Sequence, residues 1–287
     1  MRLFRSLWRS VRLAGYFAVY GAELLVKRPK TREARADWLP RFAARALRGL
    51  GIEIGLAGSF PERGAVTSNH LSYLDIVVFA ALRPCVFVSK VEIQGWPVVG
   101  WMTDMSGTVY VARGHGGSAV KARQGMRATV DAGLPVVFFP EGTTSDGSGL
   151  LPFHSGLLAQ VMSLGTTVTA THIGYSLESD NGVGVTVGDD VCYWGDVTLV
   201  PHVFRLLGLR GVKVEVRFAE RPIAFSSAPT GLAHRSRARS MSSGAASSRT
   251  TASLVLARRA ATTLAWSSAA STATTRRATR PAGRPAG

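Results

Sequence analysis

The sequence predicts an α/β fold with a mostly parallel central sheet flanked by helices, and amphipathic N-terminal helices that lie on a membrane surface. Two observations predict the sheet. Short apolar runs rich in Val, Ile and Thr recur in the middle of the chain, and helix-length segments separate them, as crossovers between parallel strands require. A third observation, the distribution of charge, indicates three regions: basic amphipathic membrane-associating helices in 1–50, an α/β domain in 51–225 and a disordered, basic, low-complexity tail in 226–287.

The formal net charge of +16 belongs to the two ends of the chain. Residues 1–50 carry 12 Lys or Arg against 3 Asp or Glu, and residues 226–287 carry 10 against none. The middle region, 51–225, carries 12 against 15. A nucleic-acid-binding domain would carry its basic patch on the folded core, so we expect no nucleic acid partner. The distribution favours a protein that meets an anionic surface through its termini.

The composition is that of a globular chain with enough apolar material for a core, since 46% of its 287 residues are hydrophobic. Its two cysteines, Cys85 and Cys192, cannot form a disulfide framework, and no Cys/His cluster suggests a structural metal. This is typical of a reducing compartment. No apolar run reaches the ~20 residues of a spanning helix, which excludes a polytopic membrane protein.

The first region carries a cationic stripe, because Arg2, Arg5, Arg9 and Arg12 share one face of a helix. The other side carries apolar residues: Leu3, Phe4, Leu7, Trp8 and Val11. The apolar segment that follows spans about 21 Å of helix, which is short of the ~30 Å hydrocarbon core. We expect this helix on a membrane surface, with a second basic amphipathic stretch, 38–50, beside it. The alternatives are a secretory signal without an evident cleavage site, and an ordinary helix that covers the domain's own core.

The middle region alternates strands and helices from Gly64 onward. Short apolar or β-branched runs predict strands at 65–68, 86–88, 108–111, 135–139, 167–173, 183–187 and 212–218. Helices are predicted at 72–82, where Ser72 can cap the first turn, at 118–132, which ends before Gly133, and at 157–164. Ligands usually bind at the carboxyl ends of such strands, and three of these ends carry reactive or polar residues.

The first such strand end contains Asn69, His70 and Asp75. A carboxylate one turn into the next helix can hold the far nitrogen of the imidazole and raise the basicity of the exposed one, which suits a general base. No G-x-S-x-G nucleophile is present, so the pair would act on a substrate hydroxyl. A lone histidine beside a helix-capping aspartate is the alternative.

The other two strand ends are residues 107–113, which finish in Arg113, and residues 139–145. The second of these contains Glu141, Gly142 and Thr143, and backbone N–H groups in such a turn can hold an anion or polarise a carbonyl. Taken separately, Arg113 could instead be a surface ion-pair partner and the segment after residue 139 a plain turn.

The order and content of these blocks resemble the glycerolipid acyltransferase family, which includes 1-acylglycerol-3-phosphate acyltransferases and lyso-ornithine-lipid relatives. The matching motifs are N-H-x4-D at 69–75, the glycine-started strand ending in arginine at 107–113, F-P-E-G-T-x-S at 139–145 and the linker at 90–100. The resemblance runs from about Gly64 to Arg221, so residues 51–225 are expected to form an acyltransferase domain.

The resemblance implies that His70 deprotonates the acceptor hydroxyl for attack on an acyl thioester, with Asp75 orienting it. The acceptor headgroup would be held by four residues: Arg113, Glu141, Gly142 and Thr143. It implies no metal or cofactor, with acyl-CoA or acyl-ACP as co-substrate, and membrane lipids as partners at the cytoplasmic face. The first candidate acceptor is 1-acylglycerol-3-phosphate, in phospholipid biosynthesis.

Two positions depart from the family pattern. Thr144 stands where the third block usually has an arginine, and Ala170 where a fourth block usually has a proline. The first departure makes another lyso-lipid, such as lyso-ornithine lipid, an alternative acceptor, and a non-catalytic membrane-binding protein is the alternative of a different class. The remaining histidines are expected in loops (His115, His154), partly buried in a strand (His172) or at the surface (His202, His234).

The tail differs abruptly from the rest of the chain. Of its 62 residues, 54 are Ser, Thr, Ala, Arg, Gly or Pro, which leaves too little apolar material to offset the entropy of ordering them. The alternative to a disordered basic tail is out-of-frame translation of a GC-rich gene.

Overall fold

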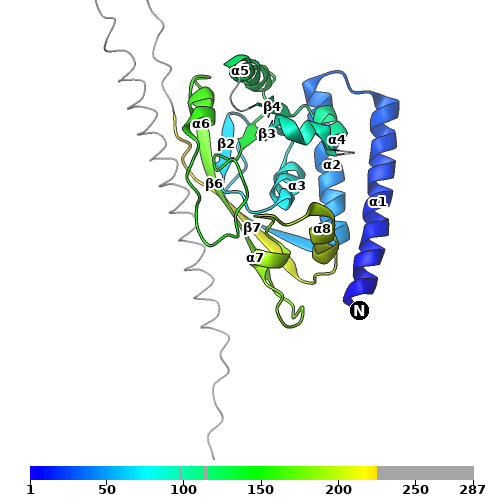
Figure 1. The fold of residues 1–287 in the computed structure, drawn as a ribbon. Helices are drawn as coiled ribbons and strands as arrows, with labels where there is room; N and C mark the ends of the chain where they lie inside the picture. Colours follow the sequence, from blue (N-terminus) through cyan, green and yellow to red (C-terminus); the bar gives the residue numbers. More distant parts are fainter. Residues whose placement is uncertain (97–98, 113–115, 225–287) are drawn as a thin grey trace, which may run out of the picture.

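The computed structural model describes residues 1–96, 99–112 and 116–224, in which helices enclose a central sheet (Figure 1). The strands are β1 (Ile52–Ala57), β2 (Ala65–Ser68), β3 (Val86–Lys90), β4 (Val109–Val111), β5 (Val136–Phe138), β6 (Val168–Leu177) and β7 (Val212–Phe218). The helices are α1 (Arg2–Lys27), α2 (Arg32–Leu50), α3 (Tyr73–Leu82), the short 3-10 helix η1 (Val91–Gly95), α4 (Val99–Met105), α5 (Gly116–Asp131), α6 (Ser155–Met162), α7 (Val187–Asp190) and α8 (Leu199–Leu207). The predicted tail lies outside the described residues.

The described strands form one sheet in the order β1-β7-β6-β2-β5-β3-β4. Every neighbouring pair is parallel except β6 and β7, which pair antiparallel. Strands β2 to β6 therefore run in one direction and end at the same edge of the sheet, whereas β1 and β7 run the opposite way. The prediction of a mostly parallel sheet flanked by helices is confirmed.

Helices cover both faces of the sheet, α2 and α3 on one side and α5 and α6 on the other (Figure 1). This explains why β5 is continuously apolar, since Val136 and Val137 are both fully buried but belong to opposite cores. Helix α3 is apolar almost all round because it lies between the sheet and α2, and its Val78 and Phe79 are fully buried.

Helices α1 and α2 form an antiparallel pair outside α3 (Figure 1). Their interface is an aromatic cluster, in which Trp38 donates its indole N–H to the carbonyl of Tyr20 at 3.1 Å and stacks on Phe42 at a centroid distance of 5.5 Å. The other side of α2 packs on the core that α3 shares, where Ala43 and Leu47 are buried. The second predicted amphipathic stretch therefore does lie beside the first, and it also covers the α/β core.

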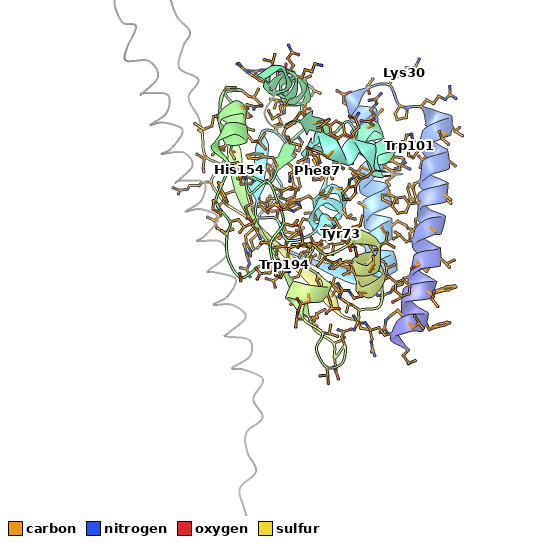
Figure 2. All side chains as sticks on the ribbon, viewed as in Figure 1. Lys30, Tyr73, Phe87, Trp101, His154 and Trp194 are labelled. Carbon is orange, nitrogen blue, oxygen red and sulfur yellow. The ribbon has the colours of Figure 1, made fainter. Side chains whose placement is uncertain are left out.

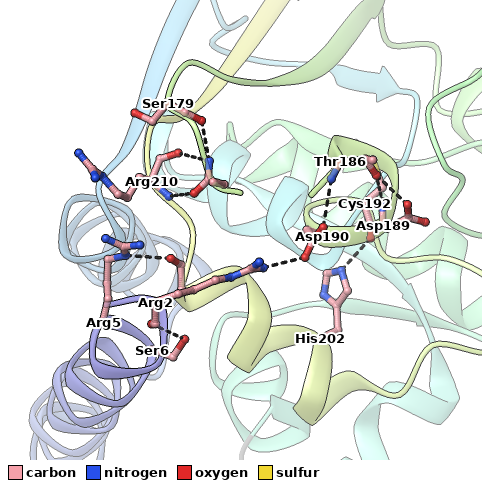
Figure 3. Close-up of polar contacts among 12 residues, drawn as sticks. Arg2, Arg5, Ser6, Ser179, Thr186, Asp189, Asp190, Cys192, His202 and Arg210 are labelled. Carbon is pink, nitrogen blue, oxygen red and sulfur yellow. Dashed lines mark hydrogen bonds and ion pairs between the residues drawn. The ribbon is translucent and has the colours of Figure 1, made fainter. Parts of the chain in front are cut away.

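The arginine stripe of α1 faces the protein. Arg2 forms an ion pair with Asp190 at 2.8 Å, and Arg5 donates to the carbonyl of Gly208, directly after α8, at 2.8 Å (Figure 3). Arg9 donates to the carbonyls of Leu207, the last residue of α8, at 3.2 Å and of Leu209 at 2.7 Å. The carbonyls of Leu207 and Gly208 lie at the negative end of the dipole of α8, which favours cationic partners. The expectation that the stripe meets an anionic surface is therefore wrong for these three arginines. The apolar side faces outward, with exposed fractions from 53% to 74% at Leu3, Phe4, Leu7, Trp8 and Val11.

One predicted strand, residues 183–187, is wrong. Gly182 and Gly184 have φ values of +97° and +78°, a left-handed backbone that interrupts any strand. Thr186 then caps α7 by accepting a hydrogen bond from the amide of Asp189 at 3.0 Å. The sequence interpretation also did not include β1, α4 or α8.

His202 was expected at the surface and is completely buried. Its Nε2 donates to the carbonyl of Cys192 at 2.8 Å (Figure 3), so its Nδ1 accepts from the hydroxyl of Tyr73 at 3.1 Å. Tyr73 is partly buried and lies beside α8 (Figure 2). A histidine is tolerated here because both ring nitrogens are hydrogen-bonded, and burial lowers the pKa of His202, which keeps the ring neutral.

Candidate active site

Two of the predicted blocks meet where β2 and β5 end. These strands pair in parallel with Thr67 opposite Phe138, so the segments that follow them leave the sheet side by side. Strand β6 flanks β2 on its other side, and the amide side chain of Asn69 ties the two together. Its Nδ2 donates to the carbonyl of Ile173 at 2.9 Å, and its Oδ1 accepts from the amide of Ile173 at 2.8 Å.

His70 and Asp75 form a hydrogen-bonded pair, with His70 Nδ1 2.8 Å from Asp75 Oδ2. The same oxygen accepts from the backbone amides of Leu71 at 2.7 Å and Ser72 at 3.0 Å, as a carboxylate in the first turn of a helix can. Asp75 is fully buried, whereas the side chain of His70 is 15% exposed. Because Nδ1 donates to the carboxylate, Nε2 is the nitrogen with a free lone pair.

The ring of Phe139 fixes the imidazole from a second direction. It stacks on His70 with a centroid distance of 3.9 Å and an interplanar angle of 10°. Asp75 holds the ring within its own plane and Phe139 supports its face. The imidazole is therefore held in one orientation before any substrate binds.

The rest of the third block closes around the backbone of His70. The amide of Ser145 donates to the carbonyl of His70 at 3.0 Å, and the amide of His154 donates to the carbonyl of Pro140 at 2.7 Å. Between these contacts the chain turns at Gly142, whose φ of +65° favours glycine. The segment after β5 is therefore a loop built against the first block.

Glu141 occupies the inner side of this loop and is only 2% exposed. Neither of its carboxylate oxygens has a hydrogen bond of normal geometry. Burial, with a smaller contribution from the Asp75 carboxylate, raises the pKa of Glu141 to about 7, and the nearby backbone amides of Leu151 and His70 offset part of that rise. Glu141 thus lies against the backbone of His70, whereas Thr143 is exposed and Gly142 half-buried.

Arg113 lies outside the described residues. The strand that precedes it, β4, is the third strand from β2 in the sheet order. At about 4.8 Å between neighbouring strands, the two strand ends are roughly 14 Å apart. The contribution of Arg113 to this site stays a prediction. Among the described residues, no group of three or more His, Cys, Asp or Glu side chains is placed to hold a metal ion.

Tyr175 is a site residue that the sequence interpretation missed. Its hydroxyl donates to Asp75 Oδ1 at 2.6 Å. The predicted strand ended at residue 173, whereas β6 continues to Leu177. A strand extended by four residues would have placed Tyr175 on the same face as Ile173, because alternate residues of a strand share a face.

The arrangement can remove a proton from a hydroxyl group. His70 Nε2 is available as the base, and the buried Asp75 carboxylate stabilises the imidazolium that forms. The side chain of Asp75 cannot act as a nucleophile on a solvent-side substrate, because it is fully buried.

Comparison with known proteins gives one consistent result. A sequence model described as "Acyltransferase" matches residues 57–174. The chain is 33% identical over 177 residues to a lyso-ornithine lipid O-acyltransferase of Pseudomonas aeruginosa, which covers 61% of this chain and 64% of that protein. It is 34% identical over 176 residues to a 1-acyl-sn-glycerol-3-phosphate acyltransferase of Neisseria gonorrhoeae, which covers 60% of this chain and 69% of that protein. The match thus spans just under two thirds of the Pseudomonas protein.

The fold is also similar to a solved structure, that of the 1-acyl-sn-glycerophosphate (LPA) acyltransferase PlsC from Thermotoga maritima. The TM-score is 0.58 with 19% sequence identity, over 88% of this chain and 96% of that chain. At this identity the likeness concerns the fold.

Proposed function

The chain belongs to the acyltransferase family, and we propose that it transfers a fatty acyl group from a thioester to the hydroxyl of a lyso-lipid. The observation that carries this proposal is the pair formed by His70 and Asp75, which leaves His70 Nε2 as a positioned base where β2 ends. The names of its relatives, which act on lyso-ornithine lipid and on 1-acylglycerol-3-phosphate, support a lyso-lipid as the acceptor.

In the proposed reaction, His70 Nε2 takes the proton of the acceptor hydroxyl while its oxygen attacks the thioester carbonyl. The tetrahedral intermediate then expels the thiolate, and the imidazolium gives this proton to the thiolate. The products are an ester and a free thiol, and His70 returns to its starting state. Asp75 stabilises the imidazolium between the two proton transfers. The donor, acyl-ACP or acyl-CoA, supplies the acyl group as a co-substrate, and the reaction as written uses no resident cofactor.

We place the acceptor headgroup against the exposed side of the third block and Arg113. The Arg113 guanidinium and the exposed Thr143 suit a phosphate, which favours 1-acylglycerol-3-phosphate. Gly142 would shape the turn that presents Thr143, since its own N–H donates to the carbonyl of Phe139 at 3.1 Å. Glu141, buried behind them, would support this loop from the inside. Thr144 in place of an arginine favours lyso-ornithine lipid as the second candidate acceptor.

The deciding experiment is radiolabelled acyl transfer by the full chain, with lysophosphatidic acid and lyso-ornithine lipid assayed side by side and with both donors. We expect transfer to lysophosphatidic acid that the His70→Ala variant loses. Faster transfer to lyso-ornithine lipid would select the second candidate. If the chain binds lipid vesicles but transfers no acyl group to either acceptor, the result would favour a non-catalytic membrane-binding protein.

We further propose that the enzyme works at the cytoplasmic face of the membrane as a peripheral or monotopic protein. No helix in the described part of the chain is both long and apolar enough to cross a bilayer. The outward apolar side of α1, from Leu3 to Val11, can enter the headgroup boundary instead, while its arginines stay on α8 and Asp190. Acyl-ACP and acyl-CoA are both cytoplasmic molecules, which supports the choice of face.

A further inference from the structure

Asp75 has a fourth hydrogen-bond partner that a histidine–aspartate pair does not require. The donors from His70, Leu71 and Ser72 all converge on Oδ2, whereas the hydroxyl of Tyr175 donates to Oδ1 at 2.6 Å. We propose that Tyr175 is a positioning residue for the acyl transfer proposed above: it fixes the rotation of the Asp75 carboxylate and moderates the hold of that carboxylate on the His70 proton. The inference rests on the proposed function.

The geometry suits positioning because Tyr175 and Asp75 belong to different rigid elements. Tyr175 lies on β6, the neighbour of β2, and Asp75 lies in the first turn of α3. Burial and the Asp75 carboxylate raise the pKa of Tyr175 well above its usual range, so its hydroxyl keeps its proton and donates. The carboxylate is thus held at both oxygens, and it cannot rotate about its Cβ–Cγ bond without breaking a buried hydrogen bond.

The same contact has an electronic consequence. A donor on Oδ1 withdraws negative charge from Oδ2, so the carboxylate binds the protonated imidazole less strongly than it otherwise would. This matters because His70 must release its proton to the departing thiolate in the second half of the reaction. Loss of the donor would leave Asp75 a stronger partner for the imidazolium, which would then give up its proton to the thiolate less readily.

Among the described residues, three other titratable groups lie near this contact. Tyr73 from α3 and Cys192 from the segment after α7 lie near Tyr175, and Glu141 lies near Asp75 from the loop after β5. Burial raises the pKa of the Tyr73 hydroxyl and raises the pKa of the Cys192 thiol to about 12, so both are neutral over the pH range of an assay. The pKa of Glu141, at about 7, lies within that range, so Glu141 also affects the pH profile of activity. The control variant must therefore retain Glu141.

The test compares Tyr175→Phe with Tyr73→Phe in the full chain. Each removes the hydroxyl of one partly buried tyrosine, but Tyr73 donates to His202 and not to Asp75. The measurement is the pH dependence of kcat and of kcat/KM with lysophosphatidic acid. For Tyr175→Phe we expect kcat to fall about tenfold with KM little changed, and the acid limb of the profile to move to higher pH by about half a unit. The Tyr73→Phe variant should have its acid limb at the same pH as the unmodified enzyme.

The inference would be overturned if Tyr175→Phe changed neither kcat nor the pH of the acid limb. It would also be overturned if the acid limb moved equally in Tyr175→Phe and Tyr73→Phe. If Tyr175→Phe does not fold, a ring-fluorinated tyrosine at position 175 serves instead. Its more acidic hydroxyl is a stronger donor, so the limb should move to lower pH, and an unmoved limb would again refute the role. A wild-type chain inactive on both lyso-lipids would instead refute the proposed function, which keeps the two failures apart.

Discussion

The turns that follow β2 and β5 lie side by side and each buries a carboxyl group, but they surround it differently. Asp75, fully buried, receives hydrogen bonds from the ring of His70, two backbone amides and the hydroxyl of Tyr175. Glu141, only 2% exposed, has no hydrogen bond of normal geometry at either oxygen. Burial of a charge is tolerated where donors replace water and is costly where they do not. The first turn is thus built to carry a negative charge, whereas the second favours a neutral carboxyl group.

The largest effect that this difference predicts is on turnover. His70→Ala should lower kcat by roughly 10²–10⁴-fold, because it removes the base without opening the core. Asp75→Asn keeps the shape of the side chain but not its charge, so the loss should be smaller if Asp75 only orients the ring. Steady-state acyl transfer with lysophosphatidic acid measures both. Near-normal turnover by a folded His70→Ala variant would contradict the assignment, and equal losses in the two variants would mean that the pair acts as one unit.

Stability should change in opposite directions at the two carboxyl groups. Asp75→Asn removes the charge that several buried donors share, so the free energy of unfolding should fall by about 2 kcal/mol. Glu141→Gln removes a group that resists ionisation in the fold. Because the folded-state pKa of Glu141 is about 7, above the usual 4.5, the wild type loses stability as pH rises from about 4.5 through 7.

Glu141→Gln should therefore have a flatter pH profile of stability than the wild type and should be more stable than it by about 2 kcal/mol at mildly alkaline pH. Chemical denaturation at an acid and an alkaline pH checks this, with Asp75→Asn as the matched carboxyl-to-amide control. A Glu141→Gln variant that is destabilised more at the alkaline pH than at the acid pH would show that the carboxylate is ionised and bound in the fold. The contrast between the two turns would then be wrong.

The sequence predicted the first turn better than the second, for a physical reason. His70 and Asp75 belong to one strand–helix junction, so their spacing alone brings them together, and Ser72 does stand at the N-cap of α3 as predicted. The contacts of the third block depend on β5 lying beside β2, a sheet order that no local pattern contains. The identity of that block came from the family resemblance, and its burial of Glu141 required the structure.

Non-local partners also account for what the sequence interpretation got wrong. The strand β7, whose valines alternate with charged residues, was predicted with its observed bounds, because a half-covered strand has an unambiguous period. Helix α1 has two usable faces, and its orientation depends on Asp190 and on the carbonyls that end α8. His202 was assigned to the surface because its partners, Tyr73 and Cys192, lie far from it in sequence or in other elements.

A substitution on the outer side of α1, far from both turns, should affect membrane binding and leave the stability of the fold nearly unchanged. Trp8, on the outward side of α1, is 56% exposed, so Trp8→Glu should change the stability of the fold by no more than about 0.5 kcal/mol. Binding to anionic vesicles should weaken about tenfold or more, because an aromatic side chain no longer enters the interface. Val120→Glu on α5, across the sheet from α1, is the control with a similar exposed fraction of 57% (Figure 1). Equal vesicle binding by both variants would remove α1 from the membrane contact.

The smallest effect should come from removing the tail. The last strand, β7, ends at Phe218, and Ile223 forms a final bridge to Val168 in β6, so a chain ending at Phe225 keeps every described contact of the sheet. The residues beyond it are mostly Ser, Thr, Ala and Arg, which bury little apolar surface, and their ten arginines can add about 1 kcal/mol each only where they approach an anionic surface. We expect unchanged turnover on detergent-solubilised substrate and an unchanged unfolding midpoint, with some loss of binding to anionic vesicles that high salt abolishes. A shortened chain that is unfolded or inactive in detergent would make the tail part of the folded domain, and the boundary at residue 225 would have to move.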